Sequence, residues 1–500
     1  MQSSSLVIEL IQVRPRLAVW IAVLLQATLW LAVALLFYAG PPPNLAIVLA
    51  YGREYQLGTD LGPPLAFWLA DIAFRAAGNH VFGVYLLAQL CSIVTFSALY
   101  HLARAIVGSQ QAVLAVLLTM TVTAFYGPNF GPLVAARPLW ALLLLHSWRL
   151  IGQNRRNVWL AWSIEAGLLL LTTSVAPGLL LLITCFALAT AQGRRVLMSV
   201  DPLYALLVII ALTLPYLNWL IRADTVAVQP LPELSDLKAL VTGWALQAGG
   251  LLSANGEILL LMVFNSRMFG RSPEDTPTIY RPPLERLARN FVYFFAIAPA
   301  LGASLFWGLF GFDLVAGGLG VPLMMTGLAA IVASGNPIHL RRPRLLRTLW
   351  VGAIVAPGLL VIASTLLLPW TGGSAVAISL PAQPIARFFV DGFERRTDKQ
   401  LRAVAGDAEI ASLISLDRGR PHLFLDATPE RTPWLTSQKF NETGGIVVWR
   451  AFDTIGRPPA PIAQRFPGLV PEIPRAFELW VNGRQPPLRI GWAIVRPKAQ

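Results

Sequence analysis

The chain has 500 residues, of which 55% are hydrophobic and only 13% are charged. Soluble proteins average about 25% charged residues, so this composition excludes a cytosolic enzyme, a disordered chain and a disulfide-stabilised secreted scaffold. The net charge of +13 could indicate nucleic-acid binding. The positions of the basic residues along the chain decide whether it does. The two cysteines, Cys91 and Cys185, lie in long apolar runs and are expected to be buried small hydrophobic residues.

Long apolar segments predict many membrane spans, because a helix of roughly 18 to 20 apolar residues can cross the hydrocarbon core of a bilayer. The first such run is longer than a signal-peptide core of about 7 to 15 residues, so it is expected to be a retained anchor. In chain order the eleven predicted spans are 17–38, 82–106, 110–127, 134–152, 158–174, 177–192, 202–221, 240–264, 291–311, 313–334 and 348–370.

The loop arginines and lysines predict the orientation, because cytoplasmic loops carry an excess of them. With the N-terminus inside, 17 of the 39 basic residues fall in cytoplasmic loops, and the opposite side has five before residue 385. Those five are Arg53, Arg75, Arg137, Arg222 and Lys238. The positive charge therefore reflects membrane topology, and no nucleic acid is expected as a partner.

The first external segment, residues 40–78, is predicted to form a platform at the outer face. Residues 44–57 are amphipathic, and Pro63 with Pro64 opens a second helix at about 65–77. Apolar and aromatic residues alternate there with a few charges, as in helices that lie in a membrane interface. The alternative is an ordinary connector, but structureless loops of this length are uncommon unless they are functional.

Residues 385–500 are predicted to form a small external α/β domain after a membrane domain at 1–384. Hydropathy falls at this boundary, and helical and strand patterns then alternate. The predicted elements are a helix at 387–402, strands at 421–426, 446–450, 477–481 and 488–495, and a helix between the first two strands. The fold class is thus mainly α, a polytopic membrane protein with a soluble α/β domain.

Common cofactor motifs are missing from the sequence. It contains no GxxxxGK, GxGxxG, HExxH or paired CxxC motif. The five histidines are scattered along the chain and are expected to be isolated rather than to bind a metal. No cofactor is predicted, and the need for a divalent cation and the oligomeric state stay open.

Four motifs carry a resemblance to a known family. They are GREYQLG at 52–58 followed by PPLAFWL at 63–69, NFGPLVAARPLWALLLL at 129–145, PHLFLDATPERTPWL at 421–435 and GGIVVWR at 444–450. In this order they resemble the family 39-like membrane glycosyltransferases, which include protein mannosyltransferases, lipid A aminoarabinose transferases and rhizobial galacturonosyltransferases.

The resemblance implies a GT-C fold and an inverting sugar transfer in the bacterial inner membrane. A polyprenyl-phosphate sugar would be the donor, and an envelope lipid or glycan at the outer face would be the acceptor, with membrane lipids around both. Such a reaction needs a carboxylate that deprotonates the acceptor hydroxyl, and cations or dipoles that stabilise the departing phosphate. It needs no nucleotide site.

Candidate site residues follow from the resemblance and from its departures. The family's first catalytic aspartate corresponds to Asn44, whose amide cannot act as a general base. Glu54 and Asp60 are the remaining acids between residues 39 and 70, so the catalytic candidates are Glu54, Asp60 and Asn44. The candidates for binding the donor phosphate are Arg53, Arg137 and Lys238, since arginine offers a planar fork to phosphate. The alternative for each charge is an interfacial anchor.

Two further classes of protein stay open. The first is a catalytically degenerate relative that serves as a lipid-binding or scaffold partner. The second is a transporter, although no repeated halves with interrupted helices are visible. Glu165 and Glu257 fall within predicted spans, where carboxylates cost roughly 2.5 to 3.5 kcal/mol and often mark function. The neighbours Asn255 and Gly256 indicate a polar break or a helix-packing site beside Glu257.

Overall fold

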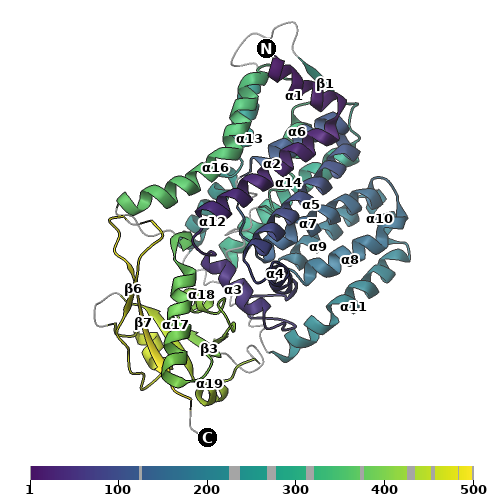
Figure 1. The fold of residues 1–500 in the computed structure, drawn as a ribbon. Helices are drawn as coiled ribbons and strands as arrows, with labels where there is room; N and C mark the ends of the chain where they lie inside the picture. The colour runs from purple at the N-terminus through teal and green to yellow at the C-terminus, as the bar shows by residue number, and fades with distance from the viewer. Residues whose placement is uncertain are drawn as a thin grey trace.

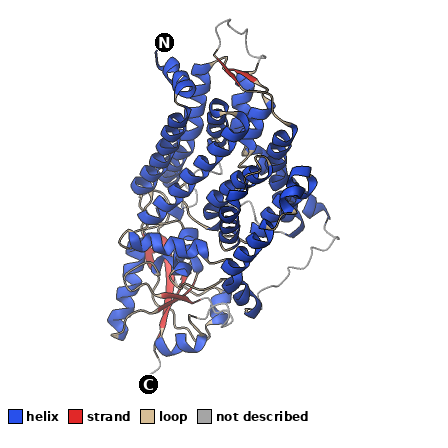
Figure 2. Cartoon of the chain, turned by 90° about the vertical axis from the view of Figure 1, so that its right-hand side faces the viewer, coloured by secondary structure: helices blue, strands red, loops and turns tan. Residues whose placement is uncertain are grey.

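The computed structural model describes residues 2–122, 127–223, 237–266, 277–310, 320–371, 377–424, 434–451, 456–481 and 483–497. A bundle of helices forms the larger part of the molecule, and a five-stranded sheet with its own helices forms the smaller part at the lower left of Figure 1. The view turned by 90° shows the same division, with a short pair of strands at the end of the bundle farthest from the sheet (Figure 2).

The bundle is built from sixteen named α-helices of very different lengths. They are α1 (Gln2–Val13), α2 (Pro15–Phe37), α3 (Pro43–Gly52), α4 (Leu65–Ala76), α5 (Phe82–Val107), α6 (Ser109–Met120), α7 (Pro132–Ile151), α8 (Trp159–Leu170), α9 (Ala176–Ala189), α10 (Ala191–Leu197), α11 (Asp201–Arg222), α12 (Leu237–Ser253), α13 (Gly256–Asn265), α14 (Arg286–Phe310), α15 (Thr326–Ala333) and α16 (Pro343–Thr371). Every one of the eleven predicted spans overlaps at least one of these helices.

The described residues contain fewer long apolar helices than the eleven predicted spans, because several of these segments form short or bent helices. Among the described residues, five helices are long and apolar enough to cross a membrane, or up to seven if each bent pair counts as one span. Helices α6 and α8 have only 12 residues each. The pair α9 and α10 is bent by 112°, and the pair α12 and α13 by 47°. Hydropathy shows that a segment is apolar, but it does not show where the helix breaks.

The break between α12 and α13 lies where the sequence indicates a polar interruption. Asn255 is the residue before α13, and its side-chain amide donates to the carbonyl of Leu251 at 2.9 Å.

The prediction that both cysteines are buried is half right. Cys91 on α5 is buried, whereas Cys185 on α9 is exposed, because the apolar surface of a membrane bundle faces lipid as well as its own core.

Loops that are predicted on the same side of the membrane meet at one end of the bundle. The amide of Leu65 at the start of α4 donates to the carbonyl of Leu171 after α8 at 2.9 Å. Gly58 contacts Trp219 near the end of α11, and the amide of Arg484 donates to the carbonyl of Pro369 in α16 at 2.8 Å. We call this the platform end and the opposite one the basal end.

The residues after the bundle form a mixed sheet with helices packed against it. The elements are α17 (Ala382–Thr397), β3 (Ala403–Gly406), α18 (Ala408–Ile414), β4 (His422–Phe424), α19 (Ser437–Thr443), β5 (Gly445–Arg450), α20 (Ala460–Arg465), β6 (Arg475–Phe477) and β7 (Leu488–Val495). The strand order is β4-β3-β5-β7-β6, with β3 parallel to both neighbours and β7 antiparallel to both of its own. We call these residues, 382–497, the C-terminal domain.

Most predicted elements of this domain are confirmed, with shifts at two places. The predicted helix at 387–402 is α17, which ends earlier because Asp398 adopts a left-handed conformation with φ 51°. The predicted strand at 477–481 pairs only up to Phe477, and the amide of Trp480 donates instead to the carbonyl of Ser379. Strand β3 and helix α18 were not predicted.

Two short strands at the basal end were not predicted either. Strand β1 (Thr278–Tyr280) pairs antiparallel with β2 (Pro337–His339). The hydroxyl of Thr278 lies 2.9 Å from Nδ1 of His339. The pair joins the segment before α14 to the segment before α16, so it ties together two connections at this end of the bundle.

Candidate active site

The two helices that were predicted for the platform are present as α3 and α4. Helix α3 ends at Gly52, several residues before the predicted end at 57, because Tyr55 has a φ of 47° that a right-handed helix cannot continue. The indole of Trp68 on α4 donates to the carbonyl of Gln56 at 3.0 Å. The loop from 53 to 64 is therefore held against α4, and it carries three of the candidate site residues: Arg53, Glu54 and Asp60.

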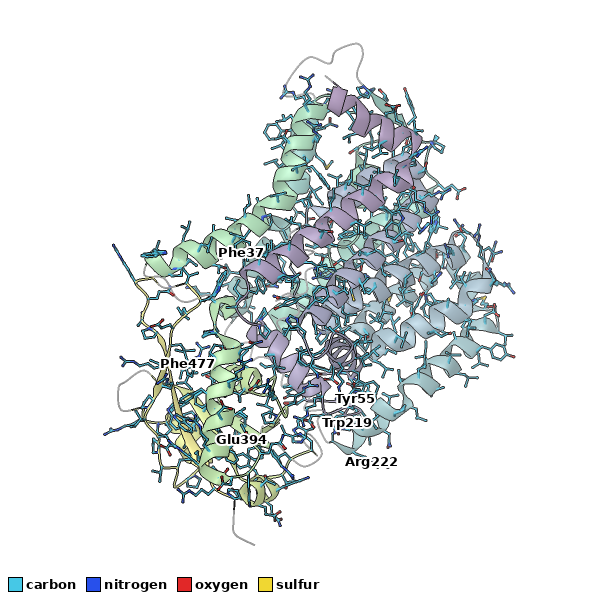
Figure 3. All side chains as sticks on the ribbon, viewed as in Figure 1. Phe37, Tyr55, Trp219, Arg222, Glu394 and Phe477 are labelled. Atoms are coloured by element: carbon cyan, nitrogen blue, oxygen red, sulfur yellow. The ribbon has the colours of Figure 1, made fainter. Side chains whose placement is uncertain are left out.

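The same loop packs against the end of α11. A Cβ atom on Gly58 would lie 2.2 Å from Cε3 of Trp219, so only glycine fits there without movement of the indole ring. Tyr55, Trp219 and Arg222 lie in the same part of the molecule, where the platform meets α11 (Figure 3). The sequence motif at 52–58 thus has a packing role as well as a chemical one.

The C-terminal domain docks on the platform through buried charges. Asp71 on α4 is fully buried, and its carboxylate lies 2.6 Å from Nη1 of Arg420 and 2.7 Å from Nε of Arg75. Nη2 of Arg420 also donates to the carbonyl of Leu49 on α3 at 3.4 Å. Arg420 therefore contacts both platform helices from the segment just before β4.

Glu54 is joined to the same domain. Its Oε1 lies 2.7 Å from Nδ1 of His422, with side-chain exposures of 6% for the glutamate and 35% for the histidine. In the neutral histidine, an Nδ1–H group that donates to Glu54 leaves the lone pair on Nε2. The carboxylate that the sequence marks as a catalytic candidate is thus partnered by an imidazole from another part of the chain.

Arg53 lies at the end of α3 among several charges. Its side chain is half-buried, and its Nη1 atom is buried without a hydrogen-bond partner among the described residues. Burial lowers the pKa of Arg53 below its ordinary value. The charges of Glu54 and Asp71 raise this pKa, whereas those of Arg420 and Arg75 lower it. The guanidinium of Arg53 therefore has an N–H group available to donate a hydrogen bond to an additional anion.

Asp60 and Asn44 differ from Glu54 in exposure. Asp60 is exposed in the turn where Thr59 and Gly62 pair, and its carboxylate accepts a hydrogen bond from the hydroxyl of Tyr51. Burial, together with this contact and the charge of Asp60, raises the pKa of Tyr51. Asn44 is exposed in the first turn of α3.

The two other candidate cations lie outside this loop. Arg137 on α7 is 4% exposed, and a Cβ atom on Gly320 would lie 2.6 Å from its Nε atom. Gly320 thus leaves room for the guanidinium near the platform end of α7. Lys238 is exposed at the start of α12. The structure therefore brings Arg53, Glu54 and Asp60 together on one loop, with Arg137 and Lys238 on separate helices.

Sequence reasoning missed the residues that surround this loop. The pair Asp71 and Arg75 was visible as an i, i+4 spacing on a predicted helix. Arg420, His422 and Tyr51 had no such signal, because only the tertiary fold brings them to the platform. The expectation that the histidines are isolated is wrong for His422, and also for His146, whose Nδ1 lies 2.8 Å from Glu165.

The membrane-embedded acids have different surroundings. Glu165 on α8 is paired with His146 on α7, a partner that the sequence did not reveal. Oε2 of Glu257, in the first turn of α13, is buried without a hydrogen-bond partner among the described residues. In the part of the chain that the structure describes, no group of three His, Cys, Asp or Glu residues could hold a metal ion.

Comparisons with known proteins agree with the resemblance seen in the motifs. Residues 62–219 match the family model described as dolichyl-phosphate-mannose-protein mannosyltransferase. The crystal structure of ArnT from Cupriavidus metallidurans in the apo state is similar, with a TM-score of 0.56 and 14% identity, covering 97% of this chain and 99% of that one. No curated protein matches the sequence.

A lower similarity connects the chain with a second solved structure. The archaeal oligosaccharyltransferase AglB from Archaeoglobus fulgidus, in complex with an inhibitory peptide and a dolichol-phosphate, matches with a TM-score of 0.43 and 11% identity. That match covers 86% of this chain and 69% of AglB. The score is too low to add to the fold assignment.

The predicted fold class is confirmed by the likeness to ArnT, which extends over nearly the whole of both chains. The protein is a polytopic membrane protein with the ArnT-like GT-C fold and a small C-terminal α/β part. The predicted resemblance to the membrane glycosyltransferase family is confirmed over residues 62–219, which include α4 to α10 and most of α11.

Proposed function

We propose that this protein is a membrane glycosyltransferase that moves a sugar from a polyprenyl-phosphate donor to an envelope lipid or glycan. The family match at 62–219 and the ArnT-like fold support the class of reaction. The site itself is proposed from the surroundings of Arg53. This cation is half-buried, its Nη1 atom lacks a partner among the described residues, and acids of the platform lie next to it. An N–H group of this kind is suited to donate a hydrogen bond to a lipid-linked phosphate.

The proposed location is the bacterial inner membrane, with the N-terminus in the cytoplasm and the C-terminal domain in the periplasm. The excess of arginine in the basal loops supports this orientation by the positive-inside rule. In this orientation the platform lies at the outer face, where a donor presented from the lipid and an envelope acceptor can meet.

Arg53 has the proposed role of binding the donor phosphate. Its charge would stabilise the phosphate as the bond to the sugar breaks. Arg137 and Lys238 are proposed as additional cations from α7 and α12, and they act at longer range in the described conformation. No metal is required by this scheme, because guanidinium and ammonium groups supply the positive charge.

Asp60 is the proposed general base. It forms no ion pair among the described residues, whereas Glu54 and Asp71 are both paired with side chains of the C-terminal domain. In the proposed step the acceptor oxygen attacks the anomeric carbon, the carbon–oxygen bond to the phosphate breaks, and the acceptor proton passes to Asp60. A single displacement of this kind inverts the anomeric configuration.

Glu54 and Asn44 have supporting roles in the same proposal. Glu54 orients His422, whose Nε2 is a second base in reach of the platform. The amide of Asn44 can donate to or accept from an acceptor hydroxyl, but it cannot take its proton. An aspartate at this position would have acted directly, so the chemistry is proposed to have moved to the loop from 53 to 64.

The experiment that tests this function is mass spectrometry of envelope glycolipids and glycans from a deletion strain. The strain is complemented with the wild type, Asp60→Asn, Glu54→Gln or the control Asp398→Asn, which changes an exposed acid at the end of α17. The proposal expects a sugar that is lost on deletion and restored by the wild type and the control but not by Asp60→Asn. Restoration by every variant would remove Asp60 as the base.

A non-catalytic scaffold is the second candidate function. It is favoured by Asn44 in place of an acid, and by the use of Glu54 and Asp71 in contacts with the C-terminal domain. A scaffold would bind a lipid or a partner without consuming a donor. The discriminating result is a deletion phenotype that the Asp60→Asn and Glu54→Gln variants both restore fully at wild-type expression.

A further inference from the structure

A cavity of about 540 Å³ lies at the basal end of the bundle, away from the candidate active site. Its walls come from α1, α2, α6, α13 and the segment that runs from β2 into α16. Figure 1 shows α1 at the end of the molecule farthest from the C-terminal domain, with α2, α13 and α16 nearby. We call this cavity the basal crevice.

Most of the lining of the basal crevice is apolar. Ile11 of α1, Ile21 of α2 and Leu118 of α6 form one side, and Leu261 of α13 and Trp350 of α16 form the other. Ile21 is 42% exposed, and Leu25 one turn along α2 is 66% exposed. Because α2 is long and apolar enough to cross a membrane, we expect the exposed surface of Ile21 and Leu25 to face lipid rather than water. An apolar cavity that opens toward lipid is suited to acyl chains.

The arginines of the lining lie on a single short stretch of the chain. Arg341 and Arg347 lie there, together with His339 at the end of β2. The backbone amide of Arg341 donates to the side chain of Asn265 at 3.1 Å, which fixes the start of this stretch against α13. Among the described residues the guanidinium of Arg341 has no hydrogen-bond or ion-pair partner.

The crevice therefore combines an acyl-chain surface with a guanidinium pair that matches phosphate. Arginine binds phosphate oxygens through charge-assisted, bidentate hydrogen bonds, and basic residues next to a membrane helix attract anionic lipids. The cavity volume falls within the range of about 300 to 1,000 Å³ that is usual for small-ligand sites. The apolar surface and the two arginines together fit an anionic amphiphile. Neither feature fits a soluble sugar.

We propose that the basal crevice binds an anionic glycerophospholipid of the leaflet opposite the platform. Its phosphate contacts Arg341 and Arg347, and its acyl chains lie between α1, α2 and α16. A bound lipid of this kind holds α1 against the bundle, since α1 supplies one wall of the crevice. This site is separate from the donor site in the proposed function, and it holds whether or not the platform is catalytic.

The test is lipid binding by the full-length protein in detergent, measured by native mass spectrometry. The probes are phosphatidylglycerol, phosphatidylcholine and a polyprenyl phosphate. The variant is the double substitution Arg341→Gln/Arg347→Gln, and the matched control is Arg342→Gln/Arg344→Gln. The control removes the same charge from the same segment, but neither residue lines the crevice. We expect the variant to bind phosphatidylglycerol about tenfold or more weakly and the control to bind as the wild type does.

A second variant keeps the test informative if the arginine changes impair folding. Ala18→Phe places a larger side chain in the crevice from a half-buried position of α2 and leaves every charge in place. It is expected to reduce the number of bound phosphatidylglycerol molecules without loss of the monodisperse protein peak. Equal loss in variant and control, no preference for phosphatidylglycerol over phosphatidylcholine, or stronger binding of polyprenyl phosphate at these arginines would each overturn the proposal.

Discussion

Arg420 and Asp71 meet across the boundary between the C-terminal domain and the platform, with 2.6 Å between Nη1 and Oδ1. Asp71 is fully buried and has Arg75 as a second cationic partner. The ring of Phe74 lies 5.0 Å from the Arg420 guanidinium, which adds a cation–π contact at the same place. The loop that carries the candidate site residues is thus bounded by a domain that comes some 350 positions later in the chain.

Substitutions in this charge cluster should destabilise the protein in a graded order. Asp71→Asn leaves two arginines without their carboxylate, so it should cost the most, about 3 kcal/mol or more. Arg420→Gln should cost less, because Arg75 still pairs with Asp71. Arg75→Gln should cost about 1 kcal/mol or less, since its side chain is 53% exposed.

Thermal unfolding in detergent measures this order. Arg418→Gln is the matched control, because Arg418 is exposed on the same segment. This variant should unfold at the wild-type temperature. A larger loss for Arg75→Gln than for Asp71→Asn would contradict the account of the cluster.

Gly58→Ala should disturb the contact between the platform and α11. The added methyl group would overlap the ring of Trp219, and overpacking of this kind typically costs about 1 to 3 kcal/mol. Shifted tryptophan fluorescence and a lower unfolding temperature are expected. Gly249→Ala is the control, because a Cβ atom there meets nothing within 4 Å. Identical behaviour of the two variants would show that Gly58 has no packing role.

Glu54→Gln and His422→Gln should show strong coupling. If Glu54 acts by orienting His422, either substitution removes the same function, so the double variant should be no less active than the worse single one. The measurement is initial rate with a lipid-linked donor for the four members of the cycle. Strictly additive losses would indicate that the two side chains act independently and only dock the domain.

The phenol of Tyr51 should resist ionisation in the folded protein. Burial, with a further contribution from Asp60, raises its pKa above the ordinary value of about 10. The folded state therefore favours the protonated form. The associated stabilisation is fully present below about pH 10 and is lost only as the pH rises toward the raised pKa.

Phenolate absorbance of the wild type compared with Tyr51→Phe measures this titration. No phenolate from Tyr51 should form near pH 10, and Asp60→Asn should bring its ionisation to lower pH. A Tyr51 that ionises like a free tyrosine would contradict its burial in the folded protein.

The sequence predicted those features that depend on local composition. Proline pairs and amphipathic spacing located α3 and α4, and short strand-like segments located β5 and β7. Strand β3 was missed because Ala403–Gly406 is only four residues long, with Val404 as its single β-branched residue and no aromatic residue. Its burial on both faces becomes visible only when β4 and β5 pair with it.

The candidate site shows the same limit at the level of chemistry. Arg53, Glu54 and Asp60 could be named from a motif, and the structure places them on one loop. His422, the partner of Glu54, and the nearby Arg420 could not be named, because no local pattern relates the residues at the start of β4 to a loop near residue 54. The roles of the three candidates depend on those partners, so the choice between Asp60 and Glu54 needed the tertiary structure.

The most direct test of the central claim is a transfer assay with the purified protein in liposomes. The substrates are a polyprenyl-phosphate sugar of known anomeric configuration and an extract of envelope lipids as acceptor. The account predicts loss of the donor, a new glycosylated lipid with inverted configuration, and a sharp fall in rate for Arg53→Gln and Asp60→Asn. Binding of the donor without consumption, over a panel of sugars and acceptors, would contradict a transferase and support the scaffold.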